Sequence, residues 1–195
     1  MARFRLRAAT VDDVEAYVRC HVECLAEAYA TLMPPDFADQ HRNAVPHRIE
    51  ETRRSWVGAA ADPSGPRAWL ATDEDGLVVG VARSGPGPQQ WERDLGAPHT
   101  TVTFELHHIY TRQRTHGSGL GQSMLEAAVG DRDAYLWILH GNQRAERFYR
   151  RNAFTPDGAE MSCGPTWFHR SMFRMVRRGR SGVSQPGNSP RIRSS

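Results

Sequence analysis

The sequence predicts an α/β fold, because strand patterns and helix patterns alternate around one glycine-rich turn. Residues 102–110 are rich in β-branched and aromatic side chains, as is typical of a strand. Residues 116–121, HGSGLG, form the turn, and a helix pattern begins inside it at Leu120. Residues 134–139 give a second apolar strand pattern, followed by a last helix pattern after Asn142. Strand, glycine turn, helix, strand and helix therefore follow one another.

The helices on either side of this second strand have recognisable limits. Gly130 is placed to end the first helix and Asn142 to begin the second. The apolar residues of the first helix recur at three- and four-residue steps: Leu120, Met124, Leu125 and Ala128. One face of the second helix is expected to carry Ala145, Phe148, Tyr149 and Asn152.

A glycine turn directly before a helix is typical of an anion site. Glycine permits positive φ and close approach of the backbone, and the N–H groups of the helix start point at the ligand. A dinucleotide fold would place such glycines after the first strand, but here they come past the middle of the chain. A phosphate-binding P-loop needs a lysine, and the sequence contains none.

The stretch 101–155 resembles the GNAT superfamily of acyl-CoA-dependent N-acetyltransferases. The resemblance covers the central strand, the Arg/Gln-x-x-Gly-x-Gly/Ala turn with its helix, and the later strand and helix with Asn142 and Tyr149. His116 stands where the family usually has Arg or Gln, so one side-chain phosphate contact is weakened while the amide cradle is kept. The resemblance implies a mixed, mostly antiparallel sheet of about six or seven strands, flanked by about four helices.

Acetyl-CoA is the cosubstrate that this resemblance implies. The amides of the glycine turn would hold the pyrophosphate, and the end of the central strand would pair with the pantetheine arm and polarise the thioester carbonyl. The cap residue before the last helix could also touch the pantetheine. The expected coenzyme contacts are Ile109, Tyr110, Thr111, His116, Gly117, Ser118, Gly119, Leu120, Gly121, Gln122, Asn142 and Tyr149.

Two side chains are candidates for catalysis. The resemblance implies that Tyr149 protonates the departing thiolate; the alternative is packing of the last helix against the sheet. The resemblance also implies a carboxylate on the central strand, so Glu105 would accept the amine proton through water or bind the substrate; the alternative is a purely structural role. His107 or His108 could replace it, because histidine titrates near neutrality. The two histidines should point to opposite faces unless a bulge intervenes.

The acceptor is expected to be a small-molecule amine, such as an antibiotic or polyamine-like compound, that attacks the thioester directly. A protein or peptide amine, or a domain that senses acetyl-CoA without turnover, are the alternatives. Residues that could line the acceptor site are Tyr29, Met33, Phe37 and His107, with core packing as the other reading. Trp69, Trp91 and Trp137 are interpreted as core or loop anchors. No zinc-like ligand spacing occurs, so no metal is expected.

Composition limits the class of protein. A length of 195 residues with 39% hydrophobic content fits one domain, assigned to residues 1–178, and residues 179–195 have the composition of a basic disordered tail. Residues 174–195 hold six arginines and no acidic residue, which leaves 19 arginines against 22 acidic residues, or −3, in residues 1–173. A mildly acidic body does not favour nucleic acid as a partner.

The same pattern bears on location and assembly. No apolar run is long enough to span a membrane, and the N-terminus lacks the apolar centre of a signal peptide. Three cysteines make a disulfide framework improbable, so a reducing cytoplasm is expected. Homodimers are common in the superfamily, but no interface can be located from the sequence.

The rest of the chain gives weaker patterns. A first strand is expected at residues 4–8, and a helix capped by Thr10 follows. A polar helix over residues 36–60 should break near Pro46. Further strands are expected over residues 68–72, 77–84 and 167–176, with a loop over residues 85–96.

Overall fold

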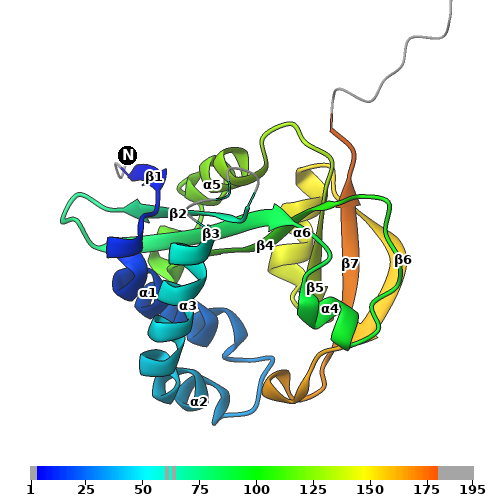
Figure 1. The fold of residues 1–195 in the computed structure, drawn as a ribbon, viewed down its shortest axis with the longest axis horizontal. Helices are drawn as coiled ribbons and strands as arrows, with labels where there is room; N and C mark the ends of the chain where they lie inside the picture. The colour runs from blue at the N-terminus through cyan, green and yellow to red at the C-terminus, as the bar shows by residue number, and fades with distance from the viewer. Residues whose placement is uncertain (1–3, 60–61, 63–64, 180–195) are drawn as a thin grey trace, which may run out of the picture.

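One seven-stranded mixed sheet, with six α-helices around it, makes up the part of the chain that can be described (Figure 1). The structure is a computed structural model and describes residues 4–59, 62 and 65–179. The strands are β1 (Arg5–Ala8), β2 (Arg67–Thr72), β3 (Val78–Pro86), β4 (Phe104–Thr111), β5 (Ala134–Leu139), β6 (Thr155–Ser162) and β7 (Ser171–Arg177). The helices are α1 (Val14–Tyr29), α2 (Phe37–Asn43), α3 (Val45–Ala59), α4 (Gln90–Asp94), α5 (Leu120–Val129) and α6 (Gln143–Arg151). The predicted fold is confirmed, with six helices in place of about four.

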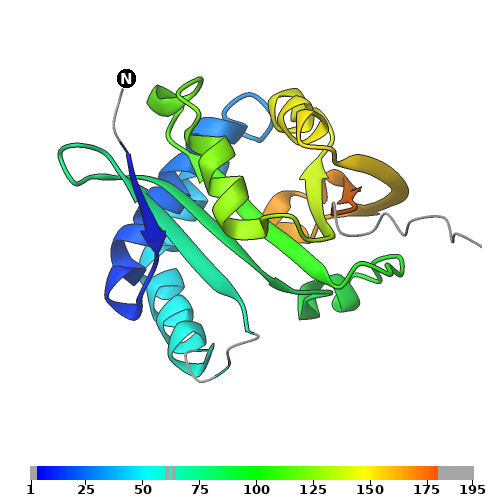
Figure 2. The same ribbon diagram turned by 90° about the horizontal axis from the view of Figure 1, so that it is seen from above.

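Helices cover both faces of the sheet, which runs in the order β1-β2-β3-β4-β5-β7-β6. Figure 2 shows α1 and α3 on one face and α5 and α6 on the other. The predicted apolar stripe of α5 packs with Leu106 of β4 and Leu136 of β5 in the largest core cluster. Gly80 on β3 allows this close packing, because a Cβ there would lie 2.7 Å from the sulfur of Met124.

The parallel strands β4 and β5 separate soon after they meet. Their register contains one pair, Glu105 with Tyr135, near the start of both strands. Every other neighbouring pair of strands in the described sheet is antiparallel and has a longer register. The ends of β4 and β5 are therefore apart, and the backbone at Ile109–Thr111 faces an opening.

A β-bulge lies in β4 beside this opening. Arg83 pairs with His108 and Ser84 with Leu106, so His107 is the extra residue. Leu106 packs in the core beneath α5, whereas His108 contacts Tyr17 of α1. The bulge thus changes the strict alternation that the sequence predicts for this strand.

Several local expectations need correction. The expected loop over residues 85–96 contains α4, whose start carries a capping box between Gln89 and Glu92. The strand β6 has an irregularity in its register with β7 between Pro156 and Glu160. The closing strand starts at Ser171, later than expected, because a 3-10 turn occupies Pro165–Trp167. Pro165 lies in the first positions of that turn, where its missing N–H costs little.

Other expectations agree with the structure. The polar helix divides at Ala44 into α2 and α3. Within the described residues no helix combines the length and apolarity that crossing a membrane requires. Residues 180–195, which hold nearly all of the expected tail, lie outside the described residues, so the division into domain and tail stays a prediction.

The core beneath α5 should carry much of the stability. Leu106→Ala removes a side chain that is 2% exposed, and we expect a loss of about 2–5 kcal/mol in the free energy of unfolding. Leu77→Ala is the matched control, because Leu77 is 59% exposed, and its effect should stay within about 0.5 kcal/mol. Urea unfolding followed by circular dichroism measures both; equal losses for the two variants would contradict this account of the core.

Candidate active site

A cavity of about 520 Å³ opens where β4 and β5 separate, between the glycine turn and α6. We call it the turn cavity. Its lining includes most of the expected coenzyme contacts. The lining residues are Ile109, Thr111, Thr115, His116, Gly117, Gly119, Leu120, Gly121, Gln122, Arg144, Ala145, Phe148, Tyr149, Arg151 and Asn152. Of the expected contacts, Tyr110, Ser118 and Asn142 do not line it.

Backbone geometry makes the glycine turn suited to an anion. Gly117 has φ 82° and Gly119 has φ 89°, in the left-handed region that side chains other than glycine rarely adopt. The hydroxyl of Ser118 accepts from the N–H of Leu120 at 3.3 Å and donates to the carbonyl of Thr115 at 2.6 Å, which fixes the turn. Gly121 and Gln122 follow in the first turn of α5, where N–H groups lack helical partners and the dipole is positive.

Arg144 supplies the positive charge that His116 does not. The guanidinium of Arg144 lies 2.8 Å from Nε2 of His116, which is also 3.2 Å from the carbonyl of Thr111. Partial burial, and then the charge of Arg144, lower the pKa of His116, which favours a neutral imidazole. Sequence reasoning missed Arg144; its place two residues after the capping Asn142 was the available signal.

The helix α6 aims Tyr149 into the turn cavity. The side chain of Asn142 accepts from the N–H of Ala145 at 3.2 Å, so the predicted cap is confirmed. Burial, and then the nearby Tyr29, raise the pKa of Tyr149 well above its usual value, which keeps its hydroxyl protonated at neutral pH. Tyr149 can therefore donate a proton.

A second cavity, of about 350 Å³, involves the side chains of Tyr110 and Trp137 on the same two strands. We call it the aromatic cavity. Its walls come from α1, α4, β4, β5 and the chain around β6 and β7. The lining residues are Tyr29, Trp91, Leu95, Tyr110, Trp137, Ile138, Leu139, Cys163, Gly164, Thr166, Trp167 and Met172. The hydroxyls of Tyr29 and Tyr110 lie 3.2 Å apart at this wall.

Among the expected acceptor residues, Tyr29 lines the aromatic cavity. Met33 and Phe37 belong to the same apolar cluster as Tyr29 but do not line the cavity. The ring of Phe37 packs against that of Tyr29, in agreement with the alternative of core packing. Trp91 and Trp137, which were interpreted from the sequence as core or loop anchors, also line this cavity. Sequence reasoning also missed Leu95, Cys163 and Trp167, which lie in segments without a distinctive motif.

Two carboxyl groups are buried together beneath Trp137. The Tyr135 hydroxyl donates to Glu92 at 2.9 Å and lies 3.5 Å from Glu105, and Trp137 Nε1 donates to Glu92 at 2.8 Å. The amide of Gln89 donates to Glu105 at 2.9 Å. Burial, and then the carboxylate of Glu92, raise the pKa of Glu105 to about 8. Glu105 lines neither cavity.

The two strand histidines are half-buried residues whose surroundings favour the neutral ring. His107 Nε2 lies 3.8 Å from Glu105, and neither ring nitrogen has a hydrogen-bond partner among the described residues. Burial lowers the pKa of His107 to about 3 and that of His108 well below its usual value. His108 Nε2 lies 2.7 Å from the Tyr17 hydroxyl, and its ring stacks on His21. Groups able to hold a metal were not found within residues 4–59, 62 and 65–179.

Residues 64–156 match the family model described as the acetyltransferase (GNAT) domain. The chain carries a GNAT domain. This confirms the resemblance predicted from the turn and its neighbouring elements. No curated protein gives a significant match.

Solved structures share the fold of this GNAT domain. The PaiA N-acetyltransferase from Thermoplasma acidophilum, in complex with coenzyme A, has a TM-score of 0.63 at 16% identity, covering 90% of this chain and 99% of that chain. A histone acetyltransferase HPA2 and related acetyltransferase from Corynebacterium glutamicum has a TM-score of 0.58 at 20% identity, covering 95% and 99%. Mutant forms of the spermidine/spermine N-acetyltransferase from Vibrio cholerae have a TM-score of 0.53 at 13% identity, covering 89% and 92%.

The raised pKa of Glu105 predicts a pH dependence of stability. Between about pH 4.5 and pH 8 the folded chain holds a proton on Glu105 that the unfolded chain has released. The free energy of unfolding should therefore lose a contribution as pH rises through this window, and Glu105→Gln should flatten that decline. Urea unfolding at a series of pH values measures it.

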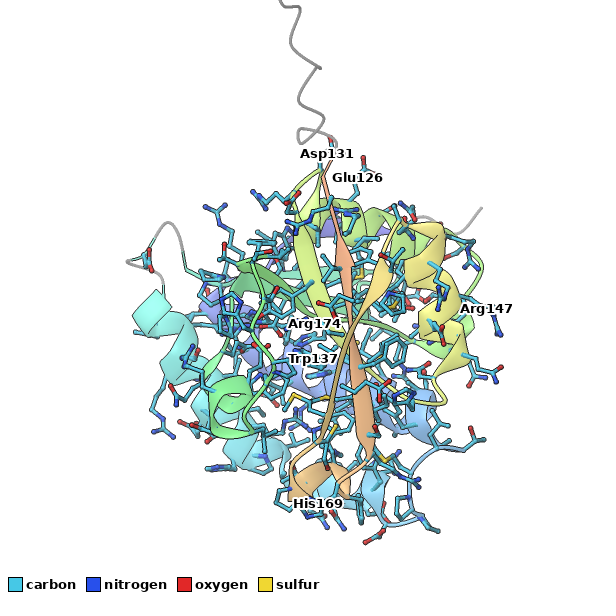
Figure 3. The ribbon with its side chains drawn as sticks, turned by 90° about the vertical axis from the view of Figure 1, so that its right-hand side faces the viewer. Glu126, Asp131, Trp137, Arg147, His169 and Arg174 are labelled. Atoms are coloured by element: carbon cyan, nitrogen blue, oxygen red, sulfur yellow. The ribbon has the colours of Figure 1, made fainter. Side chains whose placement is uncertain are left out.

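Glu126→Gln is the matched control, because Glu126 lies exposed on α5, far from Trp137 (Figure 3). This variant should keep the decline of the native chain. A Glu105→Gln variant with an undiminished decline would show that the proton is held elsewhere.

Proposed function

We propose that this GNAT domain transfers the acetyl group of acetyl-CoA to the primary amine of a small molecule. The observation that carries the proposal is the opening between β4 and β5, with an anion cradle and Tyr149 in one cavity and an aromatic wall in the other. The match to the family model and the structural neighbour solved with coenzyme A support the same cosubstrate.

In this proposal the turn cavity holds the coenzyme. The pyrophosphate is bound by the guanidinium of Arg144 and by the turn amides that have no partner within the turn, and an anion is favoured at a helix N-terminus. These amides belong to Gly117, Gly119, Gly121 and Gln122. The backbone of Ile109, Tyr110 and Thr111, left unpaired by β5, binds the pantetheine and polarises the thioester carbonyl.

The chemical step is a direct attack. The amine nitrogen forms a bond to the thioester carbonyl carbon, and the carbon–sulfur bond breaks as the thiolate leaves. Tyr149 gives that sulfur its proton, and the attacking nitrogen loses one. The cysteines do not form an acyl-enzyme in this scheme, because Cys20, Cys24 and Cys163 are buried thiols and burial raises the pKa of Cys163 to about 11.

Glu105 is the proposed final acceptor of the amine proton. With a pKa of about 8, only the deprotonated fraction of Glu105 can act as the base, and this fraction grows as the pH rises towards 8. His107, with a pKa of about 3, is too weak a base. Because Glu105 lines neither cavity, the proton reaches it through water.

A small acceptor is favoured over a protein or peptide by the size of the aromatic cavity, about 350 Å³. Tyr149 and Glu105 favour turnover over a sensor that only binds. The proposal also places the reaction in the cytoplasm, where the three free thiols would stay reduced.

The coenzyme site is tested by comparing two arginines of α6. Arg144→Ala should weaken binding of coenzyme A by about tenfold or more, since a charge-assisted hydrogen bond is lost. Arg147→Ala should leave binding unchanged, because Arg147 points from α6 into solvent (Figure 3). Isothermal titration calorimetry measures both. If the native chain does not bind coenzyme A, the proposed function falls.

The role of Tyr149 as the general acid is tested by removing its hydroxyl oxygen. Tyr149→Phe keeps the ring and loses the proton donor, so kcat should fall by about 10²–10⁴-fold while the KM for acetyl-CoA changes little. Thiol release in the presence of a primary amine measures it. Tyr17→Phe is the matched control, because it removes the hydroxyl of a tyrosine that lines neither cavity. An undiminished kcat in Tyr149→Phe would exclude this residue as the acid.

A further inference from the structure

The aromatic cavity lacks charge on its lining. Its twelve lining residues are aromatic, aliphatic, glycine, threonine, cysteine or methionine, and none carries a formal charge at neutral pH. Three of the five tryptophans of the chain, Trp91, Trp137 and Trp167, stand in this wall. Large rigid rings give apolar contact with little loss of side-chain entropy. The lining therefore favours a flat apolar ligand.

The helix α4 and the residue that follows it expose apolar side chains to solvent at this cavity. Trp91 is 36% exposed and Leu95 is 41% exposed. They are two of the four large hydrophobic side chains that are exposed within the described residues, and both line the cavity, whereas Val57 and Leu77 do not. Exposed apolar surface gathered at a hollow is typical of a surface that a ligand covers.

This wall is held in place before any ligand arrives. Glu92, in the middle of α4, accepts from the indole N–H of Trp137 at 2.8 Å and from the backbone N–H of Gln89 at 2.6 Å. The guanidinium of Arg174 lies 5.4 Å from the centre of the Trp137 ring, and Figure 3 shows the two residues next to each other. The ring of Trp137 is thus preorganised, which lowers the cost of binding.

A second charge on the acceptor would be costly here. A carboxylate or an additional ammonium in the aromatic cavity would lose water without gaining a partner of opposite charge. The buried carboxyl groups of Glu92 and Glu105 do not line the cavity. The volume of about 350 Å³ lies near the lower end for small-molecule sites, so one small ring system fills it.

We infer that the acceptor is an arylalkylamine, a primary amine joined by a short linker to one flat apolar ring system without another charged group. The ring lies among Trp91, Trp137 and Trp167. The amine lies at the paired hydroxyls of Tyr29 and Tyr110, next to the end of β4 where the thioester is placed. This inference rests on the proposed function and adds its substrate class.

The substrate class is tested with matched amines at saturating acetyl-CoA, with thiol release as the readout. The probes are 2-phenylethylamine, phenylalanine, which adds one carboxylate to the same ring and linker, and spermidine, which replaces the ring by charge. We expect kcat/KM for 2-phenylethylamine to exceed the other two by about 100-fold, since an unpaired buried charge is strongly disfavoured.

The outcomes separate this inference from the proposed function. Binding of acetyl-CoA with preferred turnover of spermidine or phenylalanine would overturn the arylalkylamine while keeping the acetyltransferase. Binding of acetyl-CoA without thiol release from 2-phenylethylamine would also overturn it. Failure to bind acetyl-CoA would remove both.

A variant of the wall gives an independent readout. Trp91→Ala should raise the KM for 2-phenylethylamine by about tenfold or more and leave the KM for acetyl-CoA unchanged, because the lost contact is to the acceptor alone. Leu77→Ala, another exposed hydrophobic residue but away from the cavity, is the control and should change neither value. An unchanged KM for the amine in Trp91→Ala would contradict the placement of the ring.

Discussion

The single register pair between β4 and β5 is the constraint on which the rest of the site depends. Two parallel strands that stayed paired would use the backbone groups of Ile109 to Thr111 in the sheet. Because the pairing stops after Glu105 and Tyr135, those groups are left for a ligand, and the space beside them becomes the turn cavity. The fold keeps the two half-sheets together through the core beneath α5 and α6 and through the antiparallel pairs on each side.

Features decided by local chemistry could be predicted from the sequence. The glycine turn and its helix depend on positive φ at Gly117 and Gly119. Positive φ can be predicted there because glycine is the residue that adopts it readily. The cap at Asn142 depends on a hydrogen bond three residues along the chain, and it is present at 3.2 Å. Strand β5 was predicted with its observed limits, because an apolar run of 6 residues between turn residues has the length of a strand and is short for a helix.

Features decided by distant contacts could not be predicted. The bulge at His107 is defined by its pairing with Arg83 and Ser84, 20 or more residues earlier in the chain. Nothing near Glu92 in sequence shows that it meets Glu105 under Tyr135, and nothing near His116 shows that Arg144 reaches it. Likewise, the sequence pattern does not distinguish an apolar residue that lines a cavity, such as Trp91, from one that packs in the core, such as Phe37. Both positions favour large apolar side chains.

The two cavities are built by different sets of helices, α5 and α6 for one, α1 and α4 for the other. Helices α1 and α5 lie on opposite faces of the sheet (Figure 2). In the proposed reaction, the coenzyme and the amine would therefore occupy cavities that are walled by different helices. Such an arrangement would let a ternary complex assemble in either order, and the double-reciprocal lines would then intersect rather than run parallel. The acetylated product and the free thiol would likewise leave from separate cavities.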